Sequence, residues 1–230
     1  MAELDFPPLA RVAAPTWRII ASRFPPVSLF DHIADPAELD IAFAIEEMTN
    51  PRVRQTVGDL RLVDPADRVS GPGTTPIMAA FTHLNPAGGR FTTPYFGAWY
   101  ASLEVETSVD ETRYHRERFL LATQEAEIDV DVRVYVADLA ADLHDVRGAG
   151  GAWPGIYDPD SHAAGQALGA RLRTAGSDGV IYDSVRRPGG TCVAAYRPRL
   201  LSGCRQERHL TYRFDGTRIT EVYEKRAFTG

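Results

Sequence analysis

The segment GGRFTTPYFGAWYASLEVETSVDE, residues 88–111, combines residue types that can bind an anion, stack on a ring and stabilise positive charge. Gly88 and Gly89 allow the backbone to approach a ligand closely and to offer N–H groups to an anion. Arg90 adds a planar guanidinium that suits phosphate oxygens. The alternative is a tight turn followed by a surface arginine, and this short motif alone does not separate the two.

Two aromatic residues, Trp99 and Tyr100, follow within a predicted strand over residues 96–101. Successive side chains of a strand point to opposite faces, so one ring is expected in the core while the other faces a cleft. A tyrosine in a cleft can stack on a flat heteroaromatic ring. The alternative is that both rings belong to the core.

A helix is predicted from about Leu103 to Thr123, with Ser102 as the N-cap. Glu104 and Glu111 are seven residues apart and therefore share a face of this helix. We expect Glu111 to face the sheet, whereas Asp110 faces water. Acidic residues near a helix start usually complement the helix dipole, which explains Glu104 better than Glu111.

The segment YDSVRRPGGT places Ser184 at the end of a predicted strand, before Arg186, Arg187 and a glycine turn. The alternative is a strand end followed by a basic loop. His83 is interpreted as a hydrogen-bonded structural residue. The chain contains no GxSxG elbow, P-loop or GxGxxG motif, so the sequence gives no local support for catalytic-triad chemistry.

Composition limits the class of protein. The 230 residues suit one large domain, and the formal charge of −6 disfavours direct binding to nucleic acid or anionic membranes. No apolar run is long enough to span a membrane, and the N-terminus lacks a secretory pattern. The two cysteines, Cys192 and Cys204, lie in no metal-binding pattern, so we expect a cytoplasmic protein without a metal site.

The predicted elements are strands and helices without a regular alternation, which indicates an α+β fold with a strongly bent sheet. A helix over residues 35–48, capped by Asp35, and a second over 160–176 are expected. The predicted loop is 64–76, and the predicted strands are 17–21, 76–83, 96–101, EIDVDVRVYVADL, GVIYDSV, TCVAAYRP and a C-terminal hairpin turning at Asp215–Gly216. We expect residues 1–70 to form an extension packed on a main domain of residues 71–230, with the strand at 17–21 contributing to that domain.

Several short motifs in order resemble the RES-domain family, bacterial toxins named for an arginine, a glutamate and a serine. WRI at 17–19, GGRF at 88–91, YAS at 100–102 and DSVR at 183–186 resemble the family's motifs. Glu111 lies eleven residues after Tyr100, as the family's glutamate does. The resemblance runs from about Trp17 to Leu201, and residues 17–54 resemble a branch with a longer N-terminus.

The resemblance implies a single domain similar to ADP-ribosyltransferase toxins, with bent central sheets flanked by helices. It implies NAD+ as substrate, cleaved at the nicotinamide–ribose bond by hydrolysis or phosphorolysis, with no metal and no cofactor beyond that substrate. The catalytic residues would be Glu111, Arg90, Tyr100 and Ser184. Arg18 and Arg90 would neutralise the pyrophosphate beside Gly89, Tyr100 would stack on nicotinamide, and Ser184 would bind the nicotinamide amide or the ribose.

The resemblance also implies a partner, an antitoxin that covers the cleft. Two other functions remain open, namely a mono-ADP-ribosyltransferase with a protein target and a non-catalytic antitoxin-binding module. The sequence does not fix the acceptor of the ADP-ribosyl group, the oligomeric state (a homodimer is compatible) or the identity of the antitoxin. Thr191 and Cys192 stand where family members often have an asparagine, which puts the binding of the second substrate in doubt.

Overall fold

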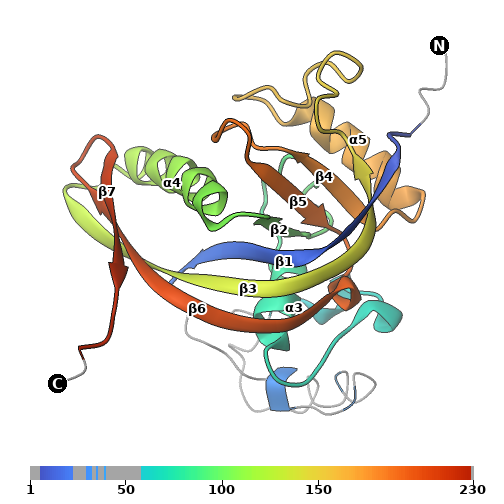
Figure 1. Cartoon of the computed structure of the whole chain (residues 1–230), viewed down its shortest axis with the longest axis horizontal. Helices are drawn as coiled ribbons and strands as arrows, with labels where there is room; N and C mark the ends of the chain where they lie inside the picture. The colour runs from blue at the N-terminus through green and yellow to red at the C-terminus, as the bar shows by residue number, and fades with distance from the viewer. Residues whose placement is uncertain (1–5, 23–29, 33–34, 36–38, 40–57, 229–230) are drawn as a thin grey trace.

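The fold is organised around one strongly bent sheet. The computed structural model describes residues 6–22, 30–32, 35, 39 and 58–228. Seven strands form the sheet in the order β1-β2-β5-β4-β3-β6-β7 (Figure 1). Their bounds are β1 Leu9–Ala21, β2 Trp99–Ser102, β3 Ile128–Asp145, β4 Gly179–Asp183, β5 Thr191–Ala195, β6 Leu201–Phe214 and β7 Ile219–Lys225. The predicted α+β class with a bent sheet and flanking helices is confirmed.

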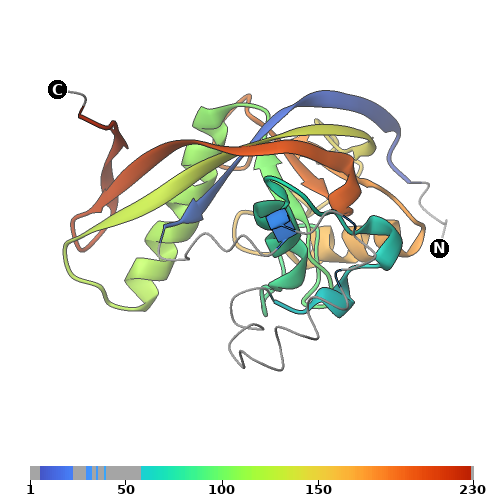
Figure 2. The same ribbon diagram turned by 90° about the horizontal axis from the view of Figure 1, so that it is seen from below.

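The sheet closes on itself through β1. This strand pairs antiparallel with β3 along its whole length, from Leu9↔His144 to Ala21↔Val132. It also meets β2 at Trp17↔Ser102. β1, β2, β5, β4 and β3 therefore form a closed ring, from which β6 and β7 continue outward. Figure 2 shows the long strands β1, β3 and β6 as one curved layer, with α3 beneath it.

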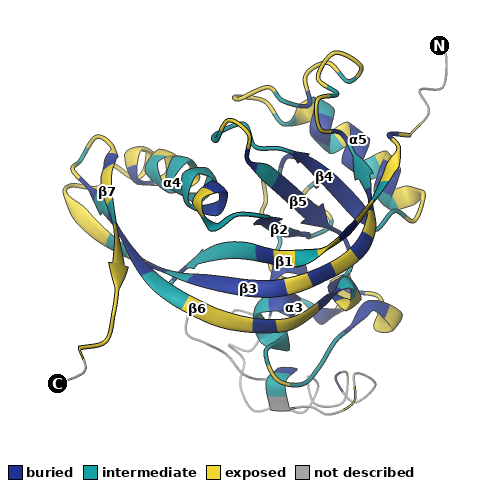
Figure 3. Ribbon diagram, in the orientation of Figure 1, coloured by how far each residue is buried: buried dark blue, intermediate teal, exposed yellow. Residues whose placement is uncertain are grey.

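Three helices of the described part pack on this sheet: α3 Thr74–Thr82, α4 Val105–Ala122 and α5 Ala163–Thr174. α3 packs in the apolar cluster that contains Trp99, and α5 adds Leu168 and Leu172 to a cluster on the other side of β4 and β5. Leu120 of α4 joins a third cluster with β3, β6 and β7. β4 and β5 are almost entirely buried, whereas α4 is mostly half-buried or exposed (Figure 3).

The strand predicted over residues 76–83 is wrong, because this segment is the helix α3. Its buried residues Ile77, Met78, Ala80 and Phe81 follow helical spacing. A short apolar run does not distinguish a buried strand from a buried helix, and here a distant carboxylate favours the helix. Asp31 accepts hydrogen bonds from Thr75 N at 2.9 Å and Thr75 Oγ1 at 2.8 Å. The predicted loop 64–76 therefore ends earlier than expected, because α3 begins at Thr74. The loop also contains a short 3-10 turn at Pro65–Asp67.

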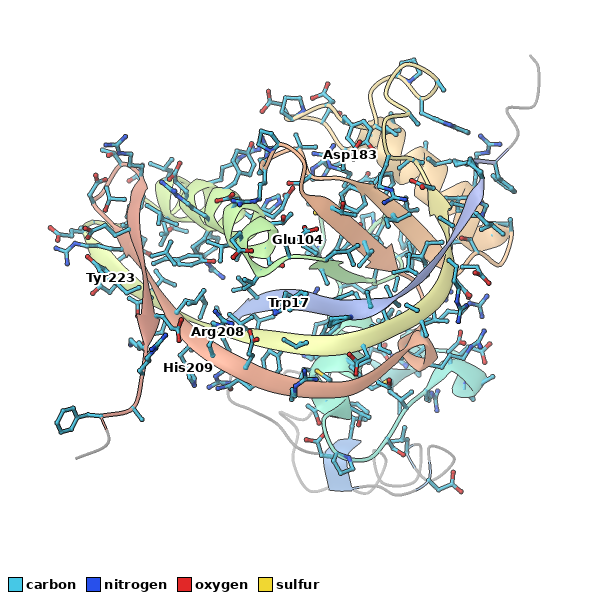
Figure 4. All side chains as sticks on the ribbon, viewed as in Figure 1. Trp17, Glu104, Asp183, Arg208, His209 and Tyr223 are labelled. Atoms are coloured by element: carbon cyan, nitrogen blue, oxygen red, sulfur yellow. The ribbon has the colours of Figure 1, made fainter. Side chains whose placement is uncertain are left out.

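The helix predicted over 103–123 exists as α4, but its cap differs. Ser102 belongs to β2, and Glu104 occupies the N-cap position. Glu104 Oε2 accepts hydrogen bonds from Thr107 Oγ1 at 2.9 Å and from Thr191 N at 3.2 Å. The carboxylate therefore joins the start of α4 to the start of β5, where Figure 4 labels it.

The other predicted elements that lie in the described residues are confirmed with longer, shorter or shifted bounds. The strand at 17–21 is the end of β1, and the alternating strand around residue 132 is β3. The helix at 160–176 is α5, and the C-terminal hairpin is β6–β7. In its turn, Asp215 Oδ1 accepts hydrogen bonds from Thr217 Oγ1, Arg218 N and Thr217 N, which lower the pKa of Asp215 to about 2.

The helix predicted over 35–48 lies outside the described residues except for Asp35 and Leu39. The proposed division at residue 70 stays a prediction. None of the helices in the described part of the chain is long and apolar enough to cross a membrane.

A buried hydroxyl joins the three strands β1, β2 and β3. Thr16 Oγ1 of β1 donates to Ala137 O of β3 at 2.9 Å and accepts from Trp99 Nε1 of β2 at 3.1 Å. Thr16 and Trp99 are both fully buried. Because a buried indole N–H without a partner is costly, this hydroxyl helps to fix β2 against the long strands.

Thr16→Val keeps the side-chain shape but leaves the Trp99 N–H without its partner, so we expect a loss of about 2 kcal/mol in the free energy of unfolding. Urea denaturation followed by tryptophan fluorescence measures the change. Thr220→Val is the matched control, since the Thr220 hydroxyl lies on the exposed strand β7. Equal urea midpoints for Thr16→Val and Thr220→Val would contradict the role of the Thr16 hydroxyl in stabilising the fold.

Candidate active site

A cavity of about 630 Å³ opens between α4, the strands β1 and β2, and the turn around residues 85–97. This volume lies within the range of small-molecule sites, roughly 300–1,000 Å³. Polar and aromatic groups from segments far apart in sequence face it together. They include Trp17, Arg18, Asn85, Gly89, Arg90, Thr92, Phe96, Tyr100, Ser102, Ser108, Glu111, Thr112, His115, His162, Tyr182 and Cys192.

Glu111 is the one carboxylate among the described residues that line this cavity. It projects from the second turn of α4, on the face toward the sheet, as predicted. Its Oε1 atom accepts a hydrogen bond of 2.6 Å from Ser184 Oγ. Asp110, predicted to face water, instead forms a partly buried ion pair with Arg187 at 2.9 Å.

Ser184 lies behind Glu111 and is not among the residues that line the cavity. Besides donating to Glu111, its hydroxyl accepts hydrogen bonds from Arg186 N at 3.1 Å and Arg187 N at 3.0 Å. These contacts fix the loop after β4 and the carboxylate at the same time. In this geometry Ser184 orients Glu111 rather than presenting its hydroxyl to the cavity.

Arg90 is buried and lines the cavity, but its surroundings differ from a free phosphate-binding turn. Its Nη1 atom donates to Ile156 O at 2.8 Å and to Asp158 O at 2.9 Å. The N–H of Gly88 donates to Asn85 O, and that of Gly89 donates to Thr92. The two glycine N–H groups are therefore used inside the turn, and any anion contact of this motif would come from the Arg90 side chain.

Tyr100 and Trp99 point to opposite faces of β2, as predicted. Trp99 is fully buried in the core, whereas Tyr100 lines the cavity. The Tyr100 hydroxyl accepts from Phe91 N at 2.8 Å and lies 3.1 Å from Thr92 Oγ1. Burial raises the pKa of Tyr100 to about 12, so the phenol is neutral at physiological pH.

Arg18 lines the cavity from β1. Its Nη1 atom donates to Tyr100 O at 3.0 Å, and its guanidinium lies 5.3 Å from the centroid of the Trp99 ring. Burial lowers its pKa to about 10, which leaves the group charged at neutral pH. The structure thus brings Arg18, Arg90, Tyr100 and Glu111 to one cavity, with Ser184 immediately behind it.

The sequence interpretation missed His115, His162 and Cys192 as lining residues. His115 lies four residues after Glu111 on the same helix, and this spacing could have revealed it. His162 precedes α5, where no local pattern indicates a site. Cys192 was predicted only to affect the binding of the second substrate, and its Sγ lies 3.5 Å from Ser102 Oγ and 4.0 Å from Glu111 Oε1.

The cavity wall changes the ionisation of these three groups. Burial lowers the pKa of His115 and that of His162, so both imidazoles are neutral at pH 7. Burial, reinforced by the Glu111 carboxylate, raises the pKa of the Cys192 thiol to about 12. Cys192 is therefore a protonated, poorly nucleophilic thiol.

Comparisons with known proteins show the family to which the chain belongs. The sequence profile of the RES domain matches residues 65–215, which is more than half of the chain. The chain belongs to the RES-domain family. The match includes Arg90, Tyr100, Glu111 and Ser184, whereas Arg18 precedes it.

A relative and a solved structure extend this comparison. The uncharacterised protein y4oC of Sinorhizobium fredii is 31% identical over 211 residues, covering 90% of this chain and 86% of that protein. A crystal structure of the MbcT–MbcA toxin–antitoxin complex of M. tuberculosis aligns over 88% of this RES-domain chain and 86% of the other, with a TM-score of 0.47 and 11% identity.

Gly89 is required by the close approach of the Tyr100 ring. A Cβ atom at Gly89 would lie 2.6 Å from the Tyr100 hydroxyl oxygen and 2.7 Å from two of its ring carbons. Gly89→Ala should therefore displace the ring and lower the free energy of unfolding by about 1–3 kcal/mol. Chemical denaturation measures the loss.

Gly151→Ala is the matched control, because nothing lies within 4 Å of an added Cβ and the residue is exposed. We expect its stability to be unchanged or raised by less than about 1 kcal/mol. Equal stabilities for the two variants would contradict the close packing of Tyr100 on Gly89.

Proposed function

We propose that this RES-domain protein is the toxin of a toxin–antitoxin pair and cleaves NAD+ at the nicotinamide–ribose bond. The observation that carries the proposal is a single oriented carboxylate, Glu111, in a cavity that also contains Arg18 and Arg90. NAD+ has the complementary charges, with a cationic nicotinamide ring and an anionic pyrophosphate. Membership of the RES-domain family supports the same assignment.

The chemistry needs a carboxylate more than it needs a proton donor. Nicotinamide leaves as a neutral molecule when the C1′–N1 bond breaks, and positive charge develops on the ribose. A carboxylate beside that ribose stabilises the charge, as in glycoside cleavage. Because Ser184 holds Oε1 of Glu111, the side chain keeps one orientation, and Oε2 remains to bind a ribose hydroxyl.

Tyr100 supplies a neutral aromatic wall. Its hydroxyl is fixed by Phe91 and Thr92, and its ring is fixed by contact with Gly89. A ring held in this way can stack on nicotinamide without a further loss of side-chain entropy. The pKa of about 12 keeps the phenol uncharged, so its ring offers stacking and not an ion pair.

The two arginines would bind the anionic half of the dinucleotide. Arg18 is fixed by Tyr100 O and by the Trp99 ring, while Arg90 is fixed by two carbonyl groups of the segment before α5. Preorganised guanidinium groups bind phosphate oxygens with little ordering cost. An enzyme that consumes NAD+ must be restrained in its own cell, and we propose an antitoxin that covers this cavity.

Glu111→Gln removes the charge but retains the size of the side chain, so we expect nicotinamide release to fall by at least about 100-fold. Purified protein is incubated with NAD+, with and without phosphate, and all products are identified. Glu106→Gln is the matched control, because Glu106 is exposed in the first turn of the same helix.

The products separate this function from its alternatives. Free ADP-ribose or its phosphate ester, formed by the wild type and the control only, supports NAD+ cleavage. Label from NAD+ that appears in a discrete protein band of a lysate would instead indicate a protein-directed ADP-ribosyltransferase. An absence of turnover by the free protein at high concentration, in a protein that still binds the antitoxin, would indicate a non-catalytic module.

Ser184→Ala removes the hydrogen bond that orients Glu111, so we expect kcat to fall about 10–100-fold with a smaller change in KM. Ser184→Thr retains the hydroxyl and should recover part of the rate. Ser177→Ala is the control, since its hydroxyl contacts only the backbone of Gly179 beside β4. A Ser184→Ala rate equal to that of the wild type would contradict the orienting role.

A further inference from the structure

A second cavity of about 400 Å³ adjoins the candidate active site. We call it the annex. Its walls include Tyr114, His115 and Arg118 of α4, opposite Asp160, Ser161 and His162, which come just before α5. It shares His115 and His162 with the main cavity. A ligand in the main cavity can therefore extend into the annex, or a second molecule can reach the first from there.

The arginines around the annex form no ion pair with a described carboxylate, although the Asp158 carboxylate interacts electrostatically with Arg90 and His162. Among the described residues, Arg90, Arg118 and Arg186 form no ion pair, although ion pairs of other arginines are frequent in the same part of the chain. Arg90 and Arg186 donate to backbone carbonyls instead. The one acidic side chain on the annex wall is Asp160.

Two of these arginines are held in place around one aromatic ring. The guanidinium of Arg186 lies 3.3 Å from the centroid of the Tyr114 ring and donates to Pro159 O at 2.7 Å. Arg118 donates from Nη1 to the Tyr114 hydroxyl at 3.0 Å and lies 5.6 Å from the same centroid. Each contact with the ring is favourable on its own, but the two guanidinium groups repel each other, and a bound anion would reduce that repulsion.

The positive charge of these arginines contributes to lowering the pKa of both histidines. Burial is the main cause of the lowered pKa of His162, and Arg90, His115, Arg186 and Arg118 lower it further. Burial also lowers the pKa of His115, against Glu111, with the same three arginines adding to the effect. An anion between these groups would favour the protonated imidazoles and raise both pKa values.

We propose that the annex binds a phosphoryl oxyanion through Arg118, with His115 and His162 beside it and Arg186 stacked behind Tyr114. α5 begins at Ala163 on the same wall, so the positive end of its dipole adds to the attraction. The site deepens the proposed function, on which its biological role rests, but the anion-binding property can be measured without turnover.

The oxyanion has two sources that share this chemistry. It can be a phosphate of the dinucleotide itself, or free inorganic phosphate that acts as the acceptor. In the second case a phosphate oxygen bonds to C1′ as the C1′–N1 bond breaks, the bonding electrons leave with neutral nicotinamide, and the phosphate proton passes to solvent. The product is then a phosphate ester of ADP-ribose.

The test follows the side-chain NMR signals of His115 and His162 as inorganic phosphate is added at constant ionic strength and fixed pH, without NAD+. We expect saturable shifts, and a pH titration at saturating phosphate should give a higher pKa for both histidines than the same titration in chloride. Arg118→Gln should weaken phosphate binding about tenfold, the effect of one lost charged hydrogen bond. Arg118→Lys should be intermediate, because it keeps the charge but not the planar fork.

Arg11→Gln is the matched control, since Arg11 is an exposed arginine whose partner Asp142 lies on β3. The proposal is overturned if the histidine shifts do not saturate, or if Arg11→Gln weakens phosphate binding as much as Arg118→Gln does. ADP-ribose then distinguishes the sources. Competition with phosphate indicates that the annex holds a phosphate of the dinucleotide, whereas simultaneous binding indicates a free phosphate acceptor.

Glu111→Gln separates this inference from the proposed function. Its phosphate binding, read on His162, should persist while nicotinamide release is lost. A protein that binds phosphate but never releases nicotinamide would contradict the enzyme and retain the anion site. A protein that turns over NAD+ without phosphate-dependent histidine shifts would support the enzyme and contradict the anion site.

Discussion

The attachment of α4 by polar groups is the constraint on which the cavity depends. This helix has little apolar surface, and Leu120 is its one fully buried large aliphatic side chain. Hydrogen bonds and ion pairs hold the rest of the helix. They join Glu104 to Thr191, Ser108 to Trp17 O, Asp110 to Arg187, Glu111 to Ser184, and both Arg113 and Glu117 to Ile219.

This mode of attachment explains why an open site can exist beside the sheet. An apolar helix would close onto the sheet and exclude the cavity, because burial of apolar area favours contact along the whole face. α4 instead meets β5 and the loop after β4 through its first two turns and meets β7 further along. The first turn of α4 also contacts β1, where Ser108 donates to Trp17 O, and Glu111 and His115 face the cavity beside this contact.

The sequence predicted which way individual side chains of the site face better than it predicted the long-range hydrogen bonds between them. Alternation along β2 correctly separated Trp99 from Tyr100, and helical spacing correctly placed Glu111 toward the sheet. The role of Ser184 could not be predicted, because its partner Glu111 is 73 residues away and the hydrogen bond depends on how the loop after β4 meets α4. Nor could a pattern within residues 76–83 reveal that Asp31 caps the segment as a helix.

Charge separation within the site is the last consequence of this arrangement. Glu111 is fixed on one wall of the main cavity, Arg18 and Arg90 also line that cavity, and Arg118 lines the annex. Under the proposed function, a ligand with a cationic ring and an anionic chain has one favourable direction in such a field, because the reverse placement brings like charges together. The neutral imidazoles of His115 and His162 line both cavities, so under the proposed function this distribution of charge would orient NAD+ before the reaction begins.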